Sequence, residues 1–134
     1  MIMSFCTRVG PRAYYIVLER EISGLDTAMC GEMLSRNIET LDSAARQLGV
    51  RPLSEFISMD PKVVEDFLGD DAAGLPIPPL REFSVEEGLA TVRGLLTRAE
   101  AESARDDLQN CERILRVAAE HGVRWHLQWI HDAR

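Results

Sequence analysis

Two segments near the ends of the chain have the polar and apolar pattern of β-strands. Residues 12–21 follow Gly10-Pro11 and are rich in aromatic and β-branched residues, as strands are. Residues 123–130 alternate strictly, with Val, Trp, Leu and Trp on one face and Arg, His and Gln on the other. This alternation predicts a strand with one buried face. We expect the two strands to pair with each other, because theirs are the two clear strand patterns in the chain.

Between these strands, apolar residues recur at the spacing of amphipathic helices. The clearest case is the segment 31–48, where the steps between apolar residues are four, three, four and three positions. Gly49 is placed to end this helix as a left-handed C-terminal cap. The stripe consists of Leu34, Ile38, Leu41, Ala45 and Leu48. Further helices are predicted at 53–57, 61–68, 85–99 and 103–121.

Two of these helices begin with recognisable capping residues. Asp60 stands before Pro61, which gives an N-cap followed by proline at the first helical position. Ser84 and Glu87 have the spacing of a capping box, in which the serine oxygen accepts from the third helical amide and the glutamate reaches back. The two signals predict where the helices at 61–68 and 85–99 start.

The order of strand, helices and strand predicts a single α+β domain over residues 1–134. Four or five helices pack on a small antiparallel sheet formed by the N- and C-terminal strands. Residues 70–82 hold three of the six prolines and have no periodicity, so we expect a Pro-rich surface connection there and not a domain boundary. The apolar runs are far shorter than the roughly 20 residues that cross a membrane. With no signal-peptide pattern at the start, we expect a cytoplasmic protein.

The charge of the chain excludes some partners and favours others. Fifteen basic and 22 acidic residues give a net charge of -7, and both halves of the chain are acidic. Nucleic acids and anionic membranes are recognised through clustered Lys and Arg, so we expect neither as a partner. A basic protein partner fits an acidic domain, since complementary potentials speed and select encounters.

Motifs for catalysis, nucleotide binding and metal binding are missing. The chain has no glycine-rich phosphate loop, no Gly-x-Ser-x-Gly and no His-Glu-x-x-His. Cys6, Cys30 and Cys111 are too far apart for a zinc site or a disulfide framework, and Cys111 falls on the apolar stripe of a predicted helix. We therefore expect reduced thiols, no cofactor and no metal.

A few polar residues are not explained by the rules of helix formation. Three of them, Glu19, Glu21 and Asp26, lie at the end of the first strand and in the loop after it, and polar loop residues on a rigid edge are where function tends to occur. His126 lies on the polar face of the second strand, and we interpret it as a lone surface histidine. Trp125 and Trp129 share the other face, where they serve the core or a subunit interface.

Several short patterns run through most of the chain. They are Gly24-Leu25-Asp26-Thr27, Leu48-Gly49-Val50-x-Pro52-Leu53, Glu87-Gly88-Leu89-x-Thr91-Val92 and Gly122-x-x-Trp125-His126-Leu127. In these patterns the chain resembles a group of small uncharacterised bacterial proteins. The resemblance implies no activity, cofactor or catalytic residue. It adds Asp26, Thr27 and His126 as polar positions that the fold alone does not require, and together with Glu19 they are our candidates for binding a ligand or partner.

Three functional hypotheses follow from the sequence. The first is a non-catalytic interaction protein of the bacterial cytoplasm, in its sharper form an acidic inhibitor or immunity-type protein that covers the basic site of a toxin or nuclease. The alternative is a small enzyme or ligand-binding domain with a polar site at the sheet edge, which requires Glu19, Asp26, Thr27 and His126 to meet in one concavity. The third is a homodimer whose Trp and Tyr residues form the subunit interface.

Overall fold

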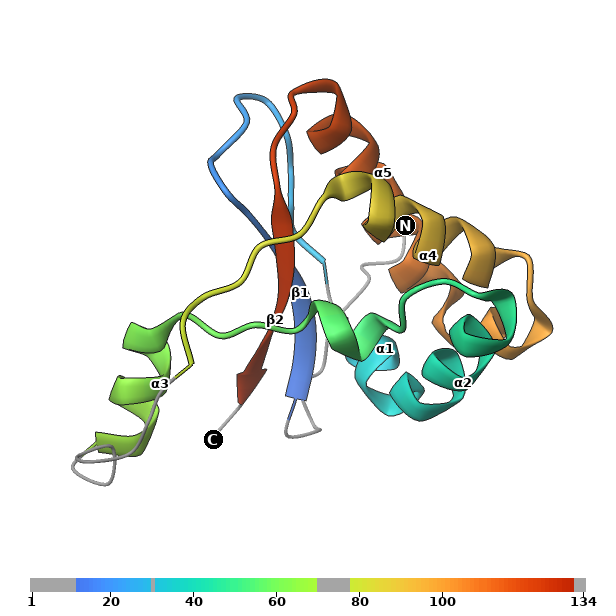
Figure 1. Ribbon diagram of the computed structural model, residues 1–134, viewed down its shortest axis with the longest axis horizontal. Helices are drawn as coiled ribbons and strands as arrows, with labels where there is room; N and C mark the ends of the chain where they lie inside the picture. The colour runs from blue at the N-terminus through green and yellow to red at the C-terminus, as the bar shows by residue number, and fades with distance from the viewer. Residues whose placement is uncertain (1–11, 30, 70–77, 132–134) are drawn as a thin grey trace, which may run out of the picture.

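The sheet joins the two ends of the described chain, as the strand patterns predict. The computed structural model describes residues 12–29, 31–69 and 78–131. Strand β1 (Arg12–Leu18) pairs antiparallel with strand β2 (Trp125–His131), and this pair forms a two-stranded sheet (Figure 1). The expected antiparallel sheet of N- and C-terminal strands is therefore confirmed.

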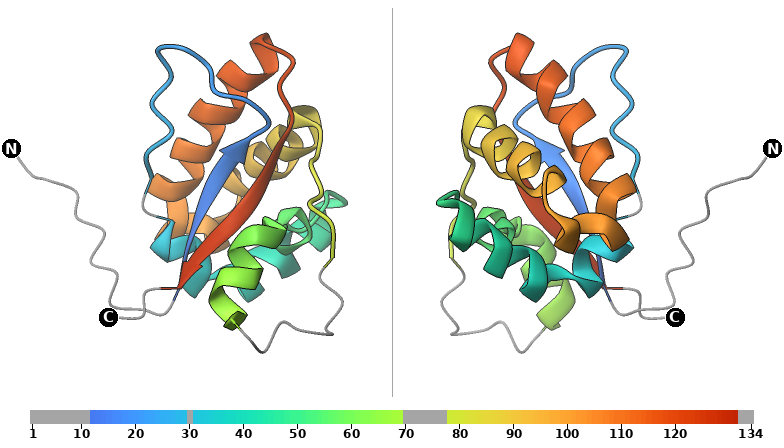
Figure 2. Two further views of the ribbon diagram at one scale, coloured as in Figure 1. Left: turned by 90° about the vertical axis from the view of Figure 1, so that its left-hand side faces the viewer. Right: turned by 90° about the vertical axis from the view of Figure 1, so that its right-hand side faces the viewer.

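Helices lie on both sides of this sheet. In the described chain they are α1 (Glu32–Arg36), α2 (Ile38–Leu48), α3 (Pro61–Leu68), α4 (Val85–Leu96) and α5 (Arg105–Glu120), with short 3-10 helices η1 (Leu53–Phe56) and η3 (Ala99–Ala104). Helices α1, α2, α4 and α5 cover one side of the sheet, whereas α3 lies on the other (Figures 1 and 2). The expected α+β fold is confirmed.

Trp125 is at the centre of the core between the sheet and α4. Its side chain is fully buried, its ring centroid lies 4.7 Å from that of Phe56, and its Nε1 donates a hydrogen bond of 3.0 Å to the carbonyl of Ser84. A Cβ atom on Gly88 would lie 2.4 Å from the indole ring, so the close approach of α4 requires glycine there. Trp125 is a core residue, and the side chain of Trp129 lies outside the described part.

The helix predicted over 31–48 is interrupted. Asn37 separates α1 from α2, and its side-chain Nδ2 donates a hydrogen bond of 2.8 Å to the carbonyl of Met33. A short amide side chain that bonds to nearby backbone competes with regular helical bonding, which explains the break. Gly49 ends α2 in the left-handed conformation as expected, but Leu48 is 37% exposed and does not belong to the core.

Helix α1 receives its N-terminal cap from a distant carboxylate. Asp107 of α5 is buried and accepts hydrogen bonds from the backbone amides of Met33 (3.0 Å) and Leu34 (3.2 Å). Burial raises the pKa of Asp107 above its ordinary value. One turn further along α5, burial raises the pKa of the Cys111 thiol to about 12, so Cys111 is the reduced core residue that its position predicts. Cys6 and Cys30 lie outside the described residues.

Two loops cover the outer edge of β2, the edge that faces away from β1. Ser58 donates its backbone amide to the carbonyl of Leu127 (2.9 Å). Phe83 exchanges two backbone hydrogen bonds with Trp125, of 2.7 and 3.0 Å. Phe83 follows the described part of the Pro-rich connection, in which residues 78–81 are exposed as expected for a surface segment. This loop brings α4 and its preceding residues against the end of β2.

Candidate functional site

Glu19 closes one end of the sheet. Its backbone amide donates to the carbonyl of Arg124 (2.8 Å), and its side-chain Oε1 accepts from the backbone amide of Arg124 (3.1 Å). The side chain is exposed, but its oxygen is used to extend the pairing of β1 and β2 by one residue. The contacts of Glu19 therefore have a structural explanation.

Asp26 and Thr27 lie in the loop between β1 and α1. The Oδ1 atom of Asp26 accepts from the backbone amide of Ala28 (2.9 Å), which is a local turn, and its carbonyl accepts from the guanidinium of Arg113 on α5 (2.7 Å). These bonds tie the loop to α5. Thr27 is exposed and lines a cavity of about 460 Å³ between this loop and β1.

His126 is buried, so the interpretation of a surface histidine is wrong. Only 1% of its surface is exposed, and Gln128 on the same face of β2 is buried too. The Oε1 atom of Gln128 lies 3.2 Å from His126 Nε2 and accepts from the backbone amide of Asp60, while its Nε2 donates to the hydroxyl of Tyr15 (2.6 Å). The segment that leads into α3 thus passes over this face, which the alternation of the strand could not indicate. His126 Nδ1 has no hydrogen-bond partner among the described residues.

The structure does not bring the four candidate residues together. Glu19, Asp26 and Thr27 are exposed, whereas His126 is enclosed on one face of the sheet. Of the four, Thr27 alone lines the cavity between β1 and the loop that follows it. The concavity that the enzyme hypothesis requires is therefore not formed by these side chains.

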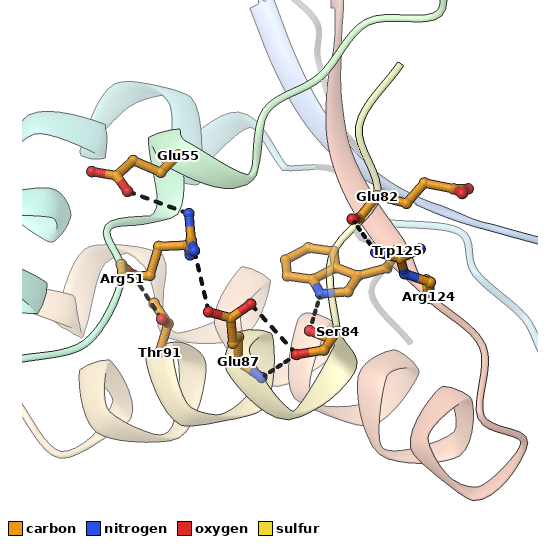
Figure 3. A network of polar contacts seen from close by, with 8 residues as sticks. All are labelled: Arg51, Glu55, Glu82, Ser84, Glu87, Thr91, Arg124 and Trp125. Carbon is orange, nitrogen blue, oxygen red and sulfur yellow. Dashed lines mark hydrogen bonds and ion pairs between the residues drawn. The ribbon is translucent and has the colours of Figure 1, made fainter. Parts of the chain in front are cut away.

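A different set of polar residues surrounds a cavity at the outer edge of β2. This cavity has a volume of about 540 Å³ and is lined by Arg51, Leu80, Arg81, Glu82, Phe83, Ser84, Glu87 and Arg124. We call it the arginine groove, and Figure 3 shows the polar contacts of five of its residues: Arg51, Glu82, Ser84, Glu87 and Arg124. It contains three guanidinium groups and two carboxylates, which leaves a net charge of 3 − 2 = +1 in a chain of net charge -7.

Arg51 is held firmly on one side of the arginine groove. Its guanidinium lies 3.2 Å from a carboxylate oxygen of Glu87 and 3.5 Å from one of Glu55. The same guanidinium lies over the rings of Phe56 and Phe83, at 5.7 and 5.5 Å from their centroids. The charge of Arg51 is thus compensated within the protein, and its role is to order this side of the groove.

Unlike Arg51, Arg81 and Arg124 form no ion pair with a carboxylate of the described chain. Arg81 lies 5.0 Å from the ring centroid of Phe83, and Arg124 donates to the backbone carbonyl of Glu82 (3.1 Å). Both side chains belong to exposed residues, and neither forms an ion pair with a carboxylate of the described chain. Each therefore keeps hydrogen-bond donors and a positive charge available to the groove.

The start of α4 forms the floor of the arginine groove. The hydroxyl of Ser84 accepts from the backbone amide of Glu87 (3.2 Å), as the capping box predicts. Instead of reaching the backbone of Ser84, the carboxylate of Glu87 lies 3.5 Å from the Ser84 hydroxyl and binds Arg51 (Figure 3). The positive end of the helix adds to the field of the arginines.

The three arginines of the groove were not among the residues predicted from the sequence. Each is in a separate loop, after α2, before Phe83 and before β2, so they share no spacing in the sequence. The sequence does contain one feature that could have indicated them. Arg51, Arg81 and Arg124 lie outside the predicted helices, so neither ion pairs along a helix nor the helix dipole account for these cations.

Comparisons with protein-family models, curated proteins and solved structures found no match to this chain. In the described residues, no group of three or more His, Cys, Asp and Glu side chains is placed to hold a metal ion. Within the same part of the chain, every helix is too short or too polar to cross a membrane. Function must therefore be inferred from the geometry of the molecule itself.

Proposed function

We propose that this chain is a non-catalytic binding protein and that its arginine groove takes an anionic group, a carboxylate or a phosphate, of a ligand or partner. The observation that carries the proposal is the pair of guanidinium groups of Arg81 and Arg124, which line one cavity without a carboxylate partner in the described chain. A planar guanidinium binds carboxylate and phosphate through two parallel hydrogen bonds, which gives such a groove its chemical preference.

Phe83 helps to hold two of the arginines in place. The guanidinium groups of Arg51 and Arg81 both lie over its ring, at 5.5 and 5.0 Å from the ring centroid. The ring is itself buried and packs edge to face on Phe56, with 5.3 Å between the centroids. Arginines that rest on a fixed ring lose less rotational freedom when they bind an anion, and the apolar surface strengthens the charged hydrogen bonds.

The net charge of the protein limits how many negative charges the ligand can have. The groove has a net charge of +1 by its lining residues, whereas the whole chain has -7. A polyanion such as a nucleic acid would meet repulsion over most of the surface, because its binding depends on many neutralised phosphates. A single carboxylate or phosphate group is the ligand that fits this balance.

The basic protein partner that the net charge predicts stays a prediction. Exposed carboxylates of the described chain occur on several elements, among them Glu39 on α2, Glu86 on α4 and Glu120 on α5. They support a second mode of binding, through general electrostatic attraction and not through one built site. A partner bound in this way would depend on the acidic surface, and its capture would survive substitution of Arg81 and Arg124.

The proposal is tested by following backbone amide signals by NMR during titration with glutarate and, separately, with inorganic phosphate. We expect saturable shifts at Ser84, Glu87 and Arg124, and at least a tenfold loss of affinity in the double variant Arg81→Ala, Arg124→Ala, about 1.4 kcal/mol. The preferred anion of the two arms identifies the ligand class.

Arg46→Ala is the matched control for this titration. Arg46 is an exposed arginine at the end of α2, outside the lining of the arginine groove. This variant changes the net charge but should bind like the wild type. Shifts that never saturate, or equal shifts in the wild type and the double variant, would refute the proposed function.

A further inference from the structure

The outer edge of β1, the edge that faces away from β2, exposes backbone groups to a cavity. In an antiparallel pair, alternate residues direct both their N–H and C=O groups toward the partner strand, and the residues between direct them away. Glu19 is bonded to Arg124 across the sheet, and Tyr14 donates outward to Gly31. With this alternation, Tyr15 and Val17 bond to β2, whereas Ile16 and Leu18 direct their amides and carbonyls outward.

The outward groups of β1 are covered at one position. Gly31 accepts from the Tyr14 amide at 3.2 Å, and a Cβ on Gly31 would lie 1.6 Å from the Tyr14 carbonyl oxygen, so the two backbones are in direct contact. No described residue forms a backbone hydrogen bond with the outward groups of Ile16 and Leu18. They border the cavity of about 460 Å³, which we call the edge cavity.

The loop of residues 19–29 closes the far side of the edge cavity. It leaves the end of β1, arches along the strand on the side opposite β2, and returns toward α1 (Figure 2). Opposite Ile16 and Leu18, the cavity is lined by five residues of this loop: Arg20, Glu21, Ile22, Leu25 and Thr27. The space is therefore bounded by a free strand edge on one side and by a loop with both apolar and charged side chains on the other.

We infer that the edge cavity binds an extended peptide segment of a partner protein, which adds to β1 as a third strand. The outward groups of Ile16 and Leu18 supply two donors and two acceptors, enough to pair with about three or four residues of an extended chain. Backbone bonds would give the affinity. The lining holds Ile22 and Leu25 as well as the charged Arg20 and Glu21, so it would select a peptide that carries both apolar and polar side chains.

One extended chain is the occupant that this space fits. The edge of a second copy would bring its own sheet and loop. The loop of residues 19–29 stands in the way of that approach, because five of its residues line the cavity on the side away from β1. The site is also separate from the arginine groove, which lies at the outer edge of β2. The inference is therefore independent of the proposed function.

The test starts with a phage-displayed library of random ten-residue peptides selected on the immobilised full chain. Selected peptides are synthesised with a fluorescent label, and their affinity is measured by anisotropy. We expect Leu18→Pro to weaken binding at least about tenfold, because proline removes the outward amide and leaves the bonds to β2 in place. Leu18→Ala is the matched control, since it loses the same side chain but keeps the amide, and its affinity should remain within about threefold of the wild type.

A second pair of variants covers the case in which Leu18→Pro fails to fold. Thr27→Trp places a large side chain in the lining of the edge cavity and should abolish peptide binding, whereas Ser23→Trp in the same loop, outside the lining, should not. The double variant Arg81→Ala, Arg124→Ala should bind the selected peptides unchanged. Loss of binding in that variant would place the peptides in the arginine groove and overturn the inference.

Amide hydrogen exchange gives the direct readout of strand addition. The Ile16 and Leu18 amides should exchange rapidly in the free protein and slowly with bound peptide, while those of Tyr15 and Val17 should be slow in both. Three results would contradict a peptide site: no selected peptide, equal affinity for wild type and Leu18→Pro, or slow exchange of Ile16 and Leu18 in a free protein that sediments as a dimer. The last would assign the edge to a second copy.

Discussion

Backbone from two separate loops covers the outer edge of β2, whereas in the described residues only Gly31 bonds to the outer edge of β1. Ser58 and Phe83 bond to β2, and Gly31 alone of the described residues bonds outward to β1. An open strand edge invites pairing with other chains, and proteins protect such edges with loops, charges or bulges. Here the covered edge of β2 presents the side chains of the arginine groove, whereas the open edge of β1 presents backbone groups. The two edges are suited to different kinds of recognition.

We expect stability to fall most on substitution of Gly31, the residue that bonds to the outer edge of β1. Gly31→Ala should lower the free energy of unfolding by about 4 kcal/mol, because the new Cβ would overlap the Tyr14 carbonyl and the backbone φ of +73° disfavours alanine. Urea denaturation measures the change. Gly24→Ala is the control, since Gly24 has a φ of +82° with no atom within 4 Å of the added Cβ, and it should cost only about 1 kcal/mol. Equal losses in the two variants would show that contact with Tyr14 is unimportant.

At the covered edge of β2, Phe83→Ala should cost about 3 kcal/mol of the free energy of unfolding. The ring is buried against Phe56 and supports two guanidinium groups, so its removal leaves a cavity and frees Arg51 and Arg81. Anion binding in the arginine groove should weaken as well. Phe83→Leu serves as the comparison, because it keeps most of the buried volume but removes the aromatic face. If it binds anions as tightly as the wild type, the ring has no role in recognition.

Asp107 connects α5 to the start of α1 and so stabilises the segment that holds Gly31. Asp107→Asn should cost about 1 kcal/mol at neutral pH, since the amide oxygen accepts from Met33 and Leu34 without charge. Burial raises the pKa of the native carboxyl above 3.8, its ordinary value. The native state then binds the proton more tightly than the unfolded state, so this contribution to stability is lost as the pH rises from 3.8 through the native pKa.

The variant Asp107→Asn cannot titrate at this position, so the difference in stability between wild type and variant should decrease across that pH interval. Urea denaturation in a series of buffers from pH 3 to neutrality, about one unit apart, measures it. A difference that increases with pH would mean that hydrogen bonds to the ionised form outweigh burial.

The smallest expected effect is at the shared end of both strands. Glu19→Gln should change the free energy of unfolding by no more than about 0.5 kcal/mol, because the exposed side chain keeps an oxygen for the Arg124 amide. Peptide and anion binding should both be unaffected. A loss of either kind of binding would mean that Glu19 takes part in recognition at that edge of the sheet.

Local patterns predicted most of the elements and little of the candidate site. Asp60 and Ser84 cap α3 and α4 as expected, since a capping side chain bonds to an amide two or three residues away. The break at Asn37 was missed because a hydrophobic stripe continues across it. The arginine groove was missed because its three cations come from loops that meet only after α2, α4 and β2 are in place.

Local patterns in the sequence were enough to predict the two strands, their pairing and the apolar faces of the helices. These properties depend on periodicity and on contacts between near neighbours in the chain, which a sequence displays directly. Three other properties became visible only in the folded molecule: His126 is buried, one edge of the sheet is covered while the other is open, and Arg81 and Arg124 share a cavity. Each of these depends on the path of an aperiodic loop across the sheet, and that path is set by packing between residues far apart in the chain.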